Sequence, residues 1–301
     1  MLTAQNEMQF GGYANNPIVV NPGAAGKSGA YEAGAGYRKQ WSGFEGSPST
    51  TILSVDGELK FLNNFHGVGA GVFYDKVGPL TTMNIHGDYS FHIELDKGLL
   101  GLGVRLGAIN VAFKTSDLSP SVSGGENDYH QSSDEALDGN DDSATAFDAG
   151  VGAFYQSDRS FLSLSILHLD APTAELKSGA KVKAKPLLTV GAGRKLGGSG
   201  SMNFEPRIFM KSDFSSMQME FSGVVNIKKM AAVGMGYRIQ DAIFFVLGVN
   251  LSNGLNVGYT YDLCLSKLSR YTSGSHEVVA SYTFNIDVEK RTKRYKSVRI
   301  L

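Results

Sequence analysis

The alternation that decides the fold is clearest in residues 100–108, which read Leu-Gly-Leu-Gly-Val-Arg-Leu-Gly-Ala. Every second residue is apolar, whereas the residues between them are glycines and Arg105. Successive side chains of an extended strand point to opposite faces. This stretch therefore predicts a β-strand with one apolar face and one face of small or charged residues.

The same split recurs along the chain, at residues 67–74, 148–155, 256–262 and 278–284. A soluble β-sandwich also alternates, with its apolar face toward a core. Three features favour a membrane barrel instead. The glycine-rich face resembles a barrel lumen, aromatic residues gather near segment ends, and segment lengths match the roughly 9 to 11 residues that a tilted strand needs to cross a bilayer. We therefore predict an all-β fold, a closed antiparallel transmembrane β-barrel.

Counting these segments predicts about 14 strands, an even number, as expected when both chain ends lie in the periplasm. Even-ranked connections are expected to form short periplasmic turns. The odd-ranked connections include the long ones, 113–143, 171–183 and 265–274, and are expected to form extracellular loops. The predicted strands are 30–41, 50–61, 65–76, 79–94, 97–112, 144–157, 160–170, 184–196, 201–212, 217–228, 231–239, 241–250, 255–264 and 275–286.

Bulk composition excludes several classes of function. The formal net charge of -1 gives no electrostatic footprint for binding nucleic acid. Cys264 is the only cysteine, which excludes an internal disulfide and cysteine-based zinc or redox motifs. No run of about 18 apolar residues exists, so no helical membrane span is expected. A length of 301 residues is compatible with a single barrel domain.

The chain is divided into four parts on this interpretation. Residues 1–4 are the remnant of a signal peptide, 5–29 a periplasmic N-terminal segment, 30–286 the β-barrel, and 287–301 a basic periplasmic tail. The N-terminal segment contains two Asn-Pro pairs, which favour turns and interrupt strand pairing. It is interpreted either as a plain lead-in or as a plug or docking element. The tail is either a solvated end or a strip that binds an acidic partner or anionic headgroups.

Closure of the barrel brings distant residues together. Strand 275–286 must pair with strand 30–41, because a closed barrel leaves no free edge. By parity, Arg38, Asp262 and Glu277 point inward near the outer rim. An unpaired charge there is costly, so a salt-bridged cluster is expected to close the seam.

The outer loop around Trp41 becomes a neighbour of loop 265–274 for the same reason. Trp41 is the only tryptophan. With Phe44 it is interpreted as an aromatic anchor for a partner, or else as a marker of the outer lipid interface. The candidate partner-binding or seam residues are Arg38, Gln40, Trp41, Gly43, Phe44, Tyr261, Asp262, Gly274, Ser275, His276 and Glu277.

Catalysis and metal binding are not expected. His276, Glu277 and nearby serines suggest a lipid hydrolase at most weakly, because no Gly-x-Ser-x-Gly elbow accompanies them. The acidic loop 115–143 has the start of a calcium-loop spacing at Asp138, Asn140 and Asp142, but it lacks the required glycine and the terminal glutamate. A solvated acidic loop or weak surface calcium binding are the two interpretations. We predict no enzyme, no cofactor and no metal site.

Four motifs occur in one order along the chain. They are the Asn-Pro pairs with Ala24-Ala25-Gly26, then Arg38-x-Gln40-Trp41-x-Gly43-Phe44-x-Gly46-x-Pro48, then Asp75-Lys76-Val77-Gly78-Pro79, and Tyr261-Asp262 followed by Tyr271 to Glu277. With these motifs the chain resembles, over nearly its whole length, the PorP/SprF family of Bacteroidetes outer-membrane proteins. That family is associated with type IX secretion and, in gliding species, with surface adhesins.

The resemblance implies an outer-membrane barrel that supports export or surface attachment of a large cargo, such as an adhesin. The implied partners are cargo carrying a type IX C-terminal domain, and periplasmic ring or lipoprotein components of the machinery. Outer-membrane lipid and lipopolysaccharide would surround the barrel. The alternative function is a diffusion channel for small or hydrophobic solutes, which the glycine-rich, charged lumen suggests.

Overall fold

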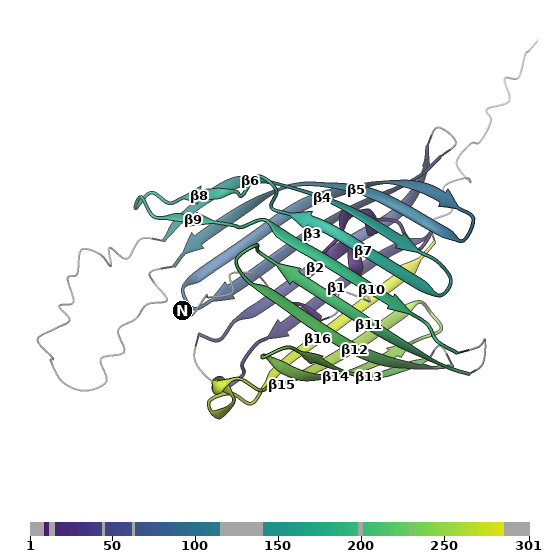
Figure 1. Cartoon of the computed structure of the whole chain (residues 1–301). Helices are drawn as coiled ribbons and strands as arrows, with labels where there is room; N and C mark the ends of the chain where they lie inside the picture. The colour runs from purple at the N-terminus through teal and green to yellow at the C-terminus, as the bar shows by residue number, and fades with distance from the viewer. Residues whose placement is uncertain are drawn as a thin grey trace, which may run out of the picture.

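The protein is a single closed barrel. The structure, a computed structural model, describes residues 9–11, 16–43, 46–61, 64–114, 141–197, 201–228 and 230–285. Fourteen antiparallel strands close on themselves where β1 pairs with both β2 and β16 (Figure 1). The barrel strands are β1 (Tyr31–Lys39), β2 (Ser49–Phe61), β3 (Asn64–Val77), β4 (Leu80–Leu95), β5 (Gly98–Phe113), β6 (Asp142–Gln156), β7 (Ser160–Leu167), β10 (Leu187–Arg194), β11 (Met202–Ser212), β12 (Met217–Ile227), β13 (Ala231–Arg238), β14 (Ala242–Asn250), β15 (Leu255–Cys264) and β16 (Ser275–Phe284).

The strand faces have the predicted polarity. On β5, Leu102 and Leu106 are 45% and 57% exposed, whereas Arg105 between them is 3% exposed. An apolar outer surface of this extent is stable against hydrocarbon and costly against water. The prediction of a membrane barrel with apolar residues outside and small or polar residues inside is therefore confirmed. In the part of the chain that is described, no helix is long and apolar enough to cross a membrane.

The predicted strands differ from the observed ones mainly at the outer ends of β7 and β10, where each prediction is three residues too long. The prediction 160–170 is too long, because His168 and Ala171 adopt left-handed backbone conformations with φ of 55° and 48°. The predicted loop 171–183 contains a hairpin, β8 (Thr173–Glu175) and β9 (Lys181–Lys183), which was not predicted. Strands of three residues are too short to produce a recognisable alternation.

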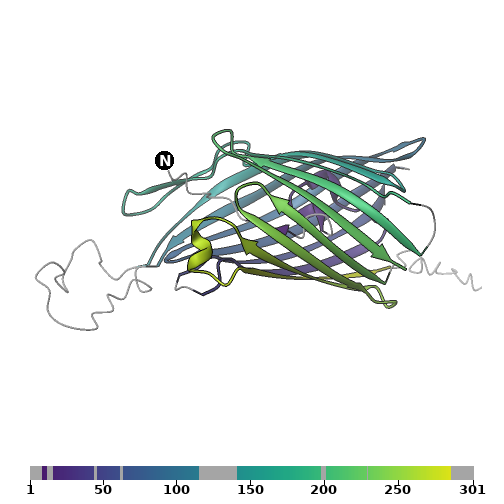
Figure 2. The ribbon, with the colours of Figure 1, turned by 60° about the horizontal axis from the view of Figure 1, so that its bottom comes forward.

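The N-terminal segment lies inside the barrel (Figure 2). Its two short 3-10 helices, η2 (Pro17–Val19) and η3 (Pro22–Ala24), are buried, and η3 contacts β4, β5 and β6. Each Asn-Pro pair starts a 3-10 turn. The side chain of Asn21 caps η3 by accepting a hydrogen bond from the Gly23 amide, whereas Asn16 makes no side-chain cap at η2. The predicted signal-peptide remnant 1–4 and basic tail 287–301 lie outside the described residues.

Candidate functional site

The predicted charge cluster forms at the seam of the barrel. Arg38 of β1 donates to Asp262 of β15 at 2.6 Å and to Glu277 of β16 at 3.2 Å. All three side chains are almost completely buried. These three residues therefore point into the lumen, as their parity predicts, and barrel closure brings them together at the seam.

The ion network also includes residues that were not predicted from the sequence. Arg238 of β13 donates to the same Asp262 at 2.8 Å, to Asp241 at 3.2 Å and to Glu220 of β12 at 3.0 Å. Its guanidinium also lies over the ring of Phe244, 5.4 Å from the centroid. Glu220 and Arg238 both have inward parity in the predicted strands 217–228 and 231–239, and this parity is the signal by which they could have been found. In the barrel they are direct cross-strand partners.

The N-terminal segment contacts this network at the outer end of the barrel. The Gly11 amide donates to Glu277 at 2.9 Å, and Gln9 donates to Asp241 at 3.3 Å. Gln40, which follows β1, donates to Gln9 at 3.2 Å. Residues 9–11 therefore join the charge cluster to the rim.

Two outer loops are tied together above the cluster. The Ser42 amide donates to the Gly274 carbonyl at 2.8 Å, and the Ser273 amide donates to the Ser42 carbonyl at 2.7 Å. The Trp41 amide donates to the Ser275 hydroxyl at 3.1 Å. The two loops thus form one continuous surface, which we call the seam rim: residues 40–43 and 271–275.

Glycine is required at Gly274 of the seam rim. Its φ is 98°, a conformation that other residues rarely adopt, and a Cβ there would lie 2.6 Å from the Asp262 carbonyl oxygen. Gly43, with a φ of 117°, lies against the backbone of residues 271–273 on the opposite loop. Phe44 lies outside the described residues.

Two of the predicted site residues face away from the cluster. His276 contacts the hydroxyl of Tyr259 at 2.7 Å and the ring of Tyr261, with 5.2 Å between centroids. Tyr261 donates to the Ser273 carbonyl at 2.9 Å, which braces loop 265–274. Because neighbours in a strand alternate between faces, His276 lies on the outer side of β16 and Glu277 on the lumen side.

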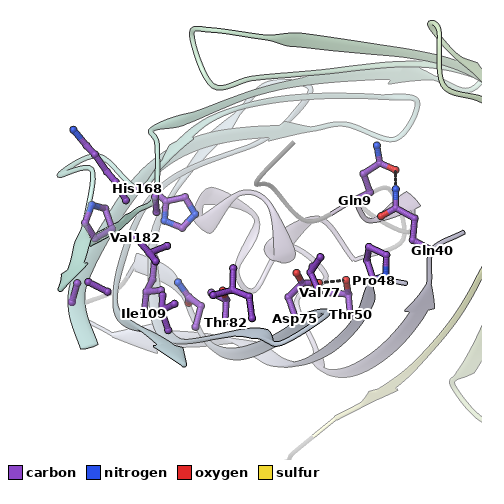
Figure 3. A pocket seen from close by; sticks show the side chains of 18 of the residues that line it. Gln9, Gln40, Pro48, Thr50, Asp75, Val77, Thr82, Ile109, His168 and Val182 are labelled. Carbon is purple, nitrogen blue, oxygen red and sulfur yellow. Dashed lines mark hydrogen bonds between the residues drawn. The ribbon is translucent and has the colours of Figure 1, made fainter. Parts of the chain in front are cut away.

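A cavity of about 330 Å³ opens beside the seam rim, inside the outer mouth of the barrel (Figure 3). One wall is apolar, where Ala174 and Val182 of the β8–β9 hairpin pack against Ile109 and Val111 of β5. The opposite side carries Gln9, Gln40, Trp41, Pro48, Thr50 and Asp75. This cavity could not be predicted from the sequence, because it depends on the β8–β9 hairpin folding back over the mouth of the barrel.

The described residues include no group of three or more His, Cys, Asp or Glu side chains that could hold a metal ion. Residues 115–140 of the acidic loop lie outside the described part of the chain. At its end, the Asp142 carboxylate accepts hydrogen bonds from the amides of Lys177 and Ser178, which tie β6 to the β8–β9 hairpin. The two interpretations of this loop, a solvated acidic segment and weak surface calcium binding, both stay predictions.

A family model described as type IX secretion system membrane protein PorP/SprF matches residues 2–282. No curated protein matches the chain. Among solved structures, the TodX deltaS2S3 mutant monoaromatic hydrocarbon channel is 12% identical with a TM-score of 0.53, and the match covers 90% of this chain and 94% of that one. Omp33 of Acinetobacter baumannii is 8% identical with a TM-score of 0.47, over 85% of this chain and 98% of that one. At these identities the similarity concerns the fold alone.

Proposed function

Because the chain belongs to the PorP/SprF family of type IX secretion system membrane proteins, we propose that it holds a large exported protein at the outer rim of its barrel. The proposed partner is a cargo with a type IX C-terminal domain, such as an adhesin. The observation that supports this most is the seam rim, in which the Ser42 and Gly274 backbones join two loops above a buried ion network. A surface that is already ordered loses less entropy when a partner binds.

The outer cavity supplies a place for an anchoring side chain of the partner. Interfaces draw most of their binding energy from a few large residues seated in desolvated pockets. The cavity of about 330 Å³ borders Trp41, and Tyr271 of the seam rim is 72% exposed. We propose Trp41 and Tyr271 as the contact residues, and no residue is given a catalytic role.

On the periplasmic side, we propose contacts with ring or lipoprotein components of the secretion machinery. The family assignment supports this part of the proposal. The predicted basic tail is the candidate contact segment, because clustered Lys and Arg residues attract acidic surfaces.

A second candidate function is a diffusion channel. Two neighbouring polar cavities at the inner end of the lumen, of about 580 and 490 Å³, favour it. Both are lined by Arg207, Asn226 and Asn250, and such amide and guanidinium groups suit hydrated solutes. Solute uptake by cells that lack or contain the barrel tests this alternative directly.

Cargo docking is tested by surface display in a deletion strain complemented with variants. We expect Trp41→Ala/Tyr271→Ala to lower the amount of cargo retained on the cell surface about tenfold, the effect of losing a hot spot. The matched control is Phe214→Ala, which removes an aromatic residue that is 67% exposed in the outer turn between β11 and β12. Equal barrel levels in all strains are required. Unchanged cargo display with the double variant, or in the deletion strain itself, would refute the proposal.

A further inference from the structure

Part of the inner barrel wall is shaped to fit the N-terminal segment. Gly67 of β3, Gly101 and Gly103 of β5 and Gly152 of β6 all face this segment. A Cβ at Gly67 would overlap the Ala25 carbonyl, and a Cβ at Gly101 would overlap the Gly23 carbonyl. At these positions even alanine is excluded, so the backbone of the segment takes the space of side chains.

Buried polar groups of the same wall bind the carbonyls of the segment. Arg105 donates to the carbonyls of Ile18 and Val19, and Asp88 holds the Arg105 guanidinium at 2.7 Å. Other strands contribute donors in the same way. Ser90 reaches the Gly23 carbonyl at 3.1 Å, His92 contacts the Ala25 carbonyl at 2.9 Å, and Ser165 reaches the Val20 carbonyl at 2.6 Å.

The side chain of Asn21 gives this contact its specificity. It is fully buried, and its amide nitrogen donates to the Ser163 hydroxyl at 2.8 Å and to the Ala153 carbonyl at 2.9 Å. At the inner end, the Gly26 amide donates to Asp56 at 2.8 Å. A buried amide is retained only where both its donors and its acceptor are satisfied.

The segment also extends across the lumen and along it. Asn16 bonds to Ser54 of β2 at 2.7 Å, whereas Asn21 reaches β7. Gln9 lies at the outer end, beside Asp241 in the turn between β13 and β14. Gly26 lies against Gly57 and Gly67, near the inner ends of β2 and β3. The described N-terminal residues therefore run from the inner end to the outer rim.

We propose that the wall formed by β2 to β7 is a peptide-binding site, which we call the glycine seat, and that its ligand closes the lumen. The seat consists of Gly67, Gly101, Gly103 and Gly152 with Arg105, Ser90, His92 and Ser165. Its ligand class is a peptide of small residues with the pattern Asn-Pro-Gly-Ala-Ala-Gly, which folds into a short 3-10 turn at Pro22–Ala24. In this chain residues 16–26 occupy it. This proposal is independent of cargo docking at the seam rim.

The first test adds methyl groups to the glycine seat of the full-length protein. Gly101→Ala/Gly103→Ala places a Cβ at two positions where Gly23 and Pro22 leave no room. The matched control is Gly191→Ala, another lumen position, whose Cβ would have its nearest neighbour at 3.4 Å. In planar bilayers we expect no pore current from the wild type or the control, and stepwise current from the seat variant. Trypsin cleavage at Lys27 should accelerate only in the seat variant.

The second test keeps the proposal falsifiable if the seat variant does not fold. Deleting residues 16–29 should produce an open pore, and a synthetic peptide of residues 16–29 added to the inner side should block it. The same peptide with Asn21→Ala should need an about tenfold higher concentration, because its buried hydrogen bonds are lost.

Each result decides the proposal. The proposal is supported if the wild type gives no pore current while the seat variant or the deletion variant does. It is also supported if the native peptide blocks the pore of the deletion variant. Equal current from wild type and deletion variant would overturn it. So would a deletion variant that is folded, judged by its heat-dependent gel mobility, yet silent. Equal block by both peptides would show that Asn21 does not define the ligand.

Discussion

Replacing Arg38 with methionine is the sharpest test of the ion network at the seam. Arg38 contacts Asp262 at 2.6 Å and Glu277 at 3.2 Å, and no side chain in these pairs is more than 3% exposed. In the variant, Asp262 keeps Arg238 at 2.8 Å. Among the described residues, Glu277 keeps only the Gly11 amide at 2.9 Å. The variant thus leaves one buried carboxylate without a counter-ion.

Removing one partner of a buried ion pair costs about 3–5 kcal/mol of unfolding free energy. At about 1.4 kcal/mol per factor of ten, the folding equilibrium constant should fall about 10²- to 10⁴-fold. The double variant Arg38→Met/Glu277→Met removes both charges, so it should be more stable than Arg38→Met by about 2 kcal/mol. Lys181→Met is the control. Its ion pair with Glu175 is 61% exposed on both sides and should contribute about 0–1 kcal/mol.

The assay is reversible urea unfolding in lipid vesicles, followed by the fluorescence of Trp41, which lies near Arg38 in the sequence and at the same rim. The slope of the transition should stay the same in all variants, because the barrel unfolds as a whole. A loss for Arg38→Met no larger than that for Lys181→Met would refute the reasoning. A double variant less stable than Arg38→Met would refute it too.

Two further predictions concern the outer turns. Gly274→Ala should lower the unfolding free energy by about 1–3 kcal/mol, because φ is 98° and the new Cβ would lie 2.6 Å from the Asp262 carbonyl oxygen. Gly78→Ala is the control in the same urea assay. Its φ is 56° and its Cβ would enter open space, so it should cost only about 1 kcal/mol. At Asp213, desolvation raises the pKa, but hydrogen bonds from Ser216 and Lys185 outweigh it and hold the pKa below its ordinary 3.8. A carboxyl group whose pKa is lower in the folded state stabilises the fold at pH values above its unfolded-state pKa. This stabilisation is lost as the pH falls through the folded-state pKa. Protection against hydrogen exchange in residues 213–216 should therefore stay constant as the pH falls to 3.8 and be lost only below it. Loss of protection above 3.8 would contradict this assignment.

The strand pattern could be predicted from the sequence because it depends on local information. The alternation around Leu102 and Arg105 assigns each side chain to the lipid or the lumen without reference to any partner. Each of the predicted strands accordingly overlaps one barrel strand. Errors occur where the backbone leaves the extended conformation, as at His168, because nothing in the alternation signals a positive φ.

The candidate site was predictable only in part. Closure pairs the first strand with the last, so the meeting of Arg38 with Asp262 and Glu277 followed from topology. Arg238 was missed although its parity is inward. The parity of a residue shows that its side chain points into the lumen, but the tilt of the strands decides which charged side chains lie at the same height along the barrel axis.

By itself, then, the sequence determined the barrel, its polarity and the residues that meet at its seam, since each follows from a two-residue period and the absence of a free edge. Only the tertiary structure decided what fills the lumen. The fit of Gly101 and Gly103 against Gly23, and the hairpin that folds over Ile109, join segments whose contacts have no sequence period. Such contacts depend on how a closed, sheared sheet positions its inner wall, and a single strand carries no information about that position.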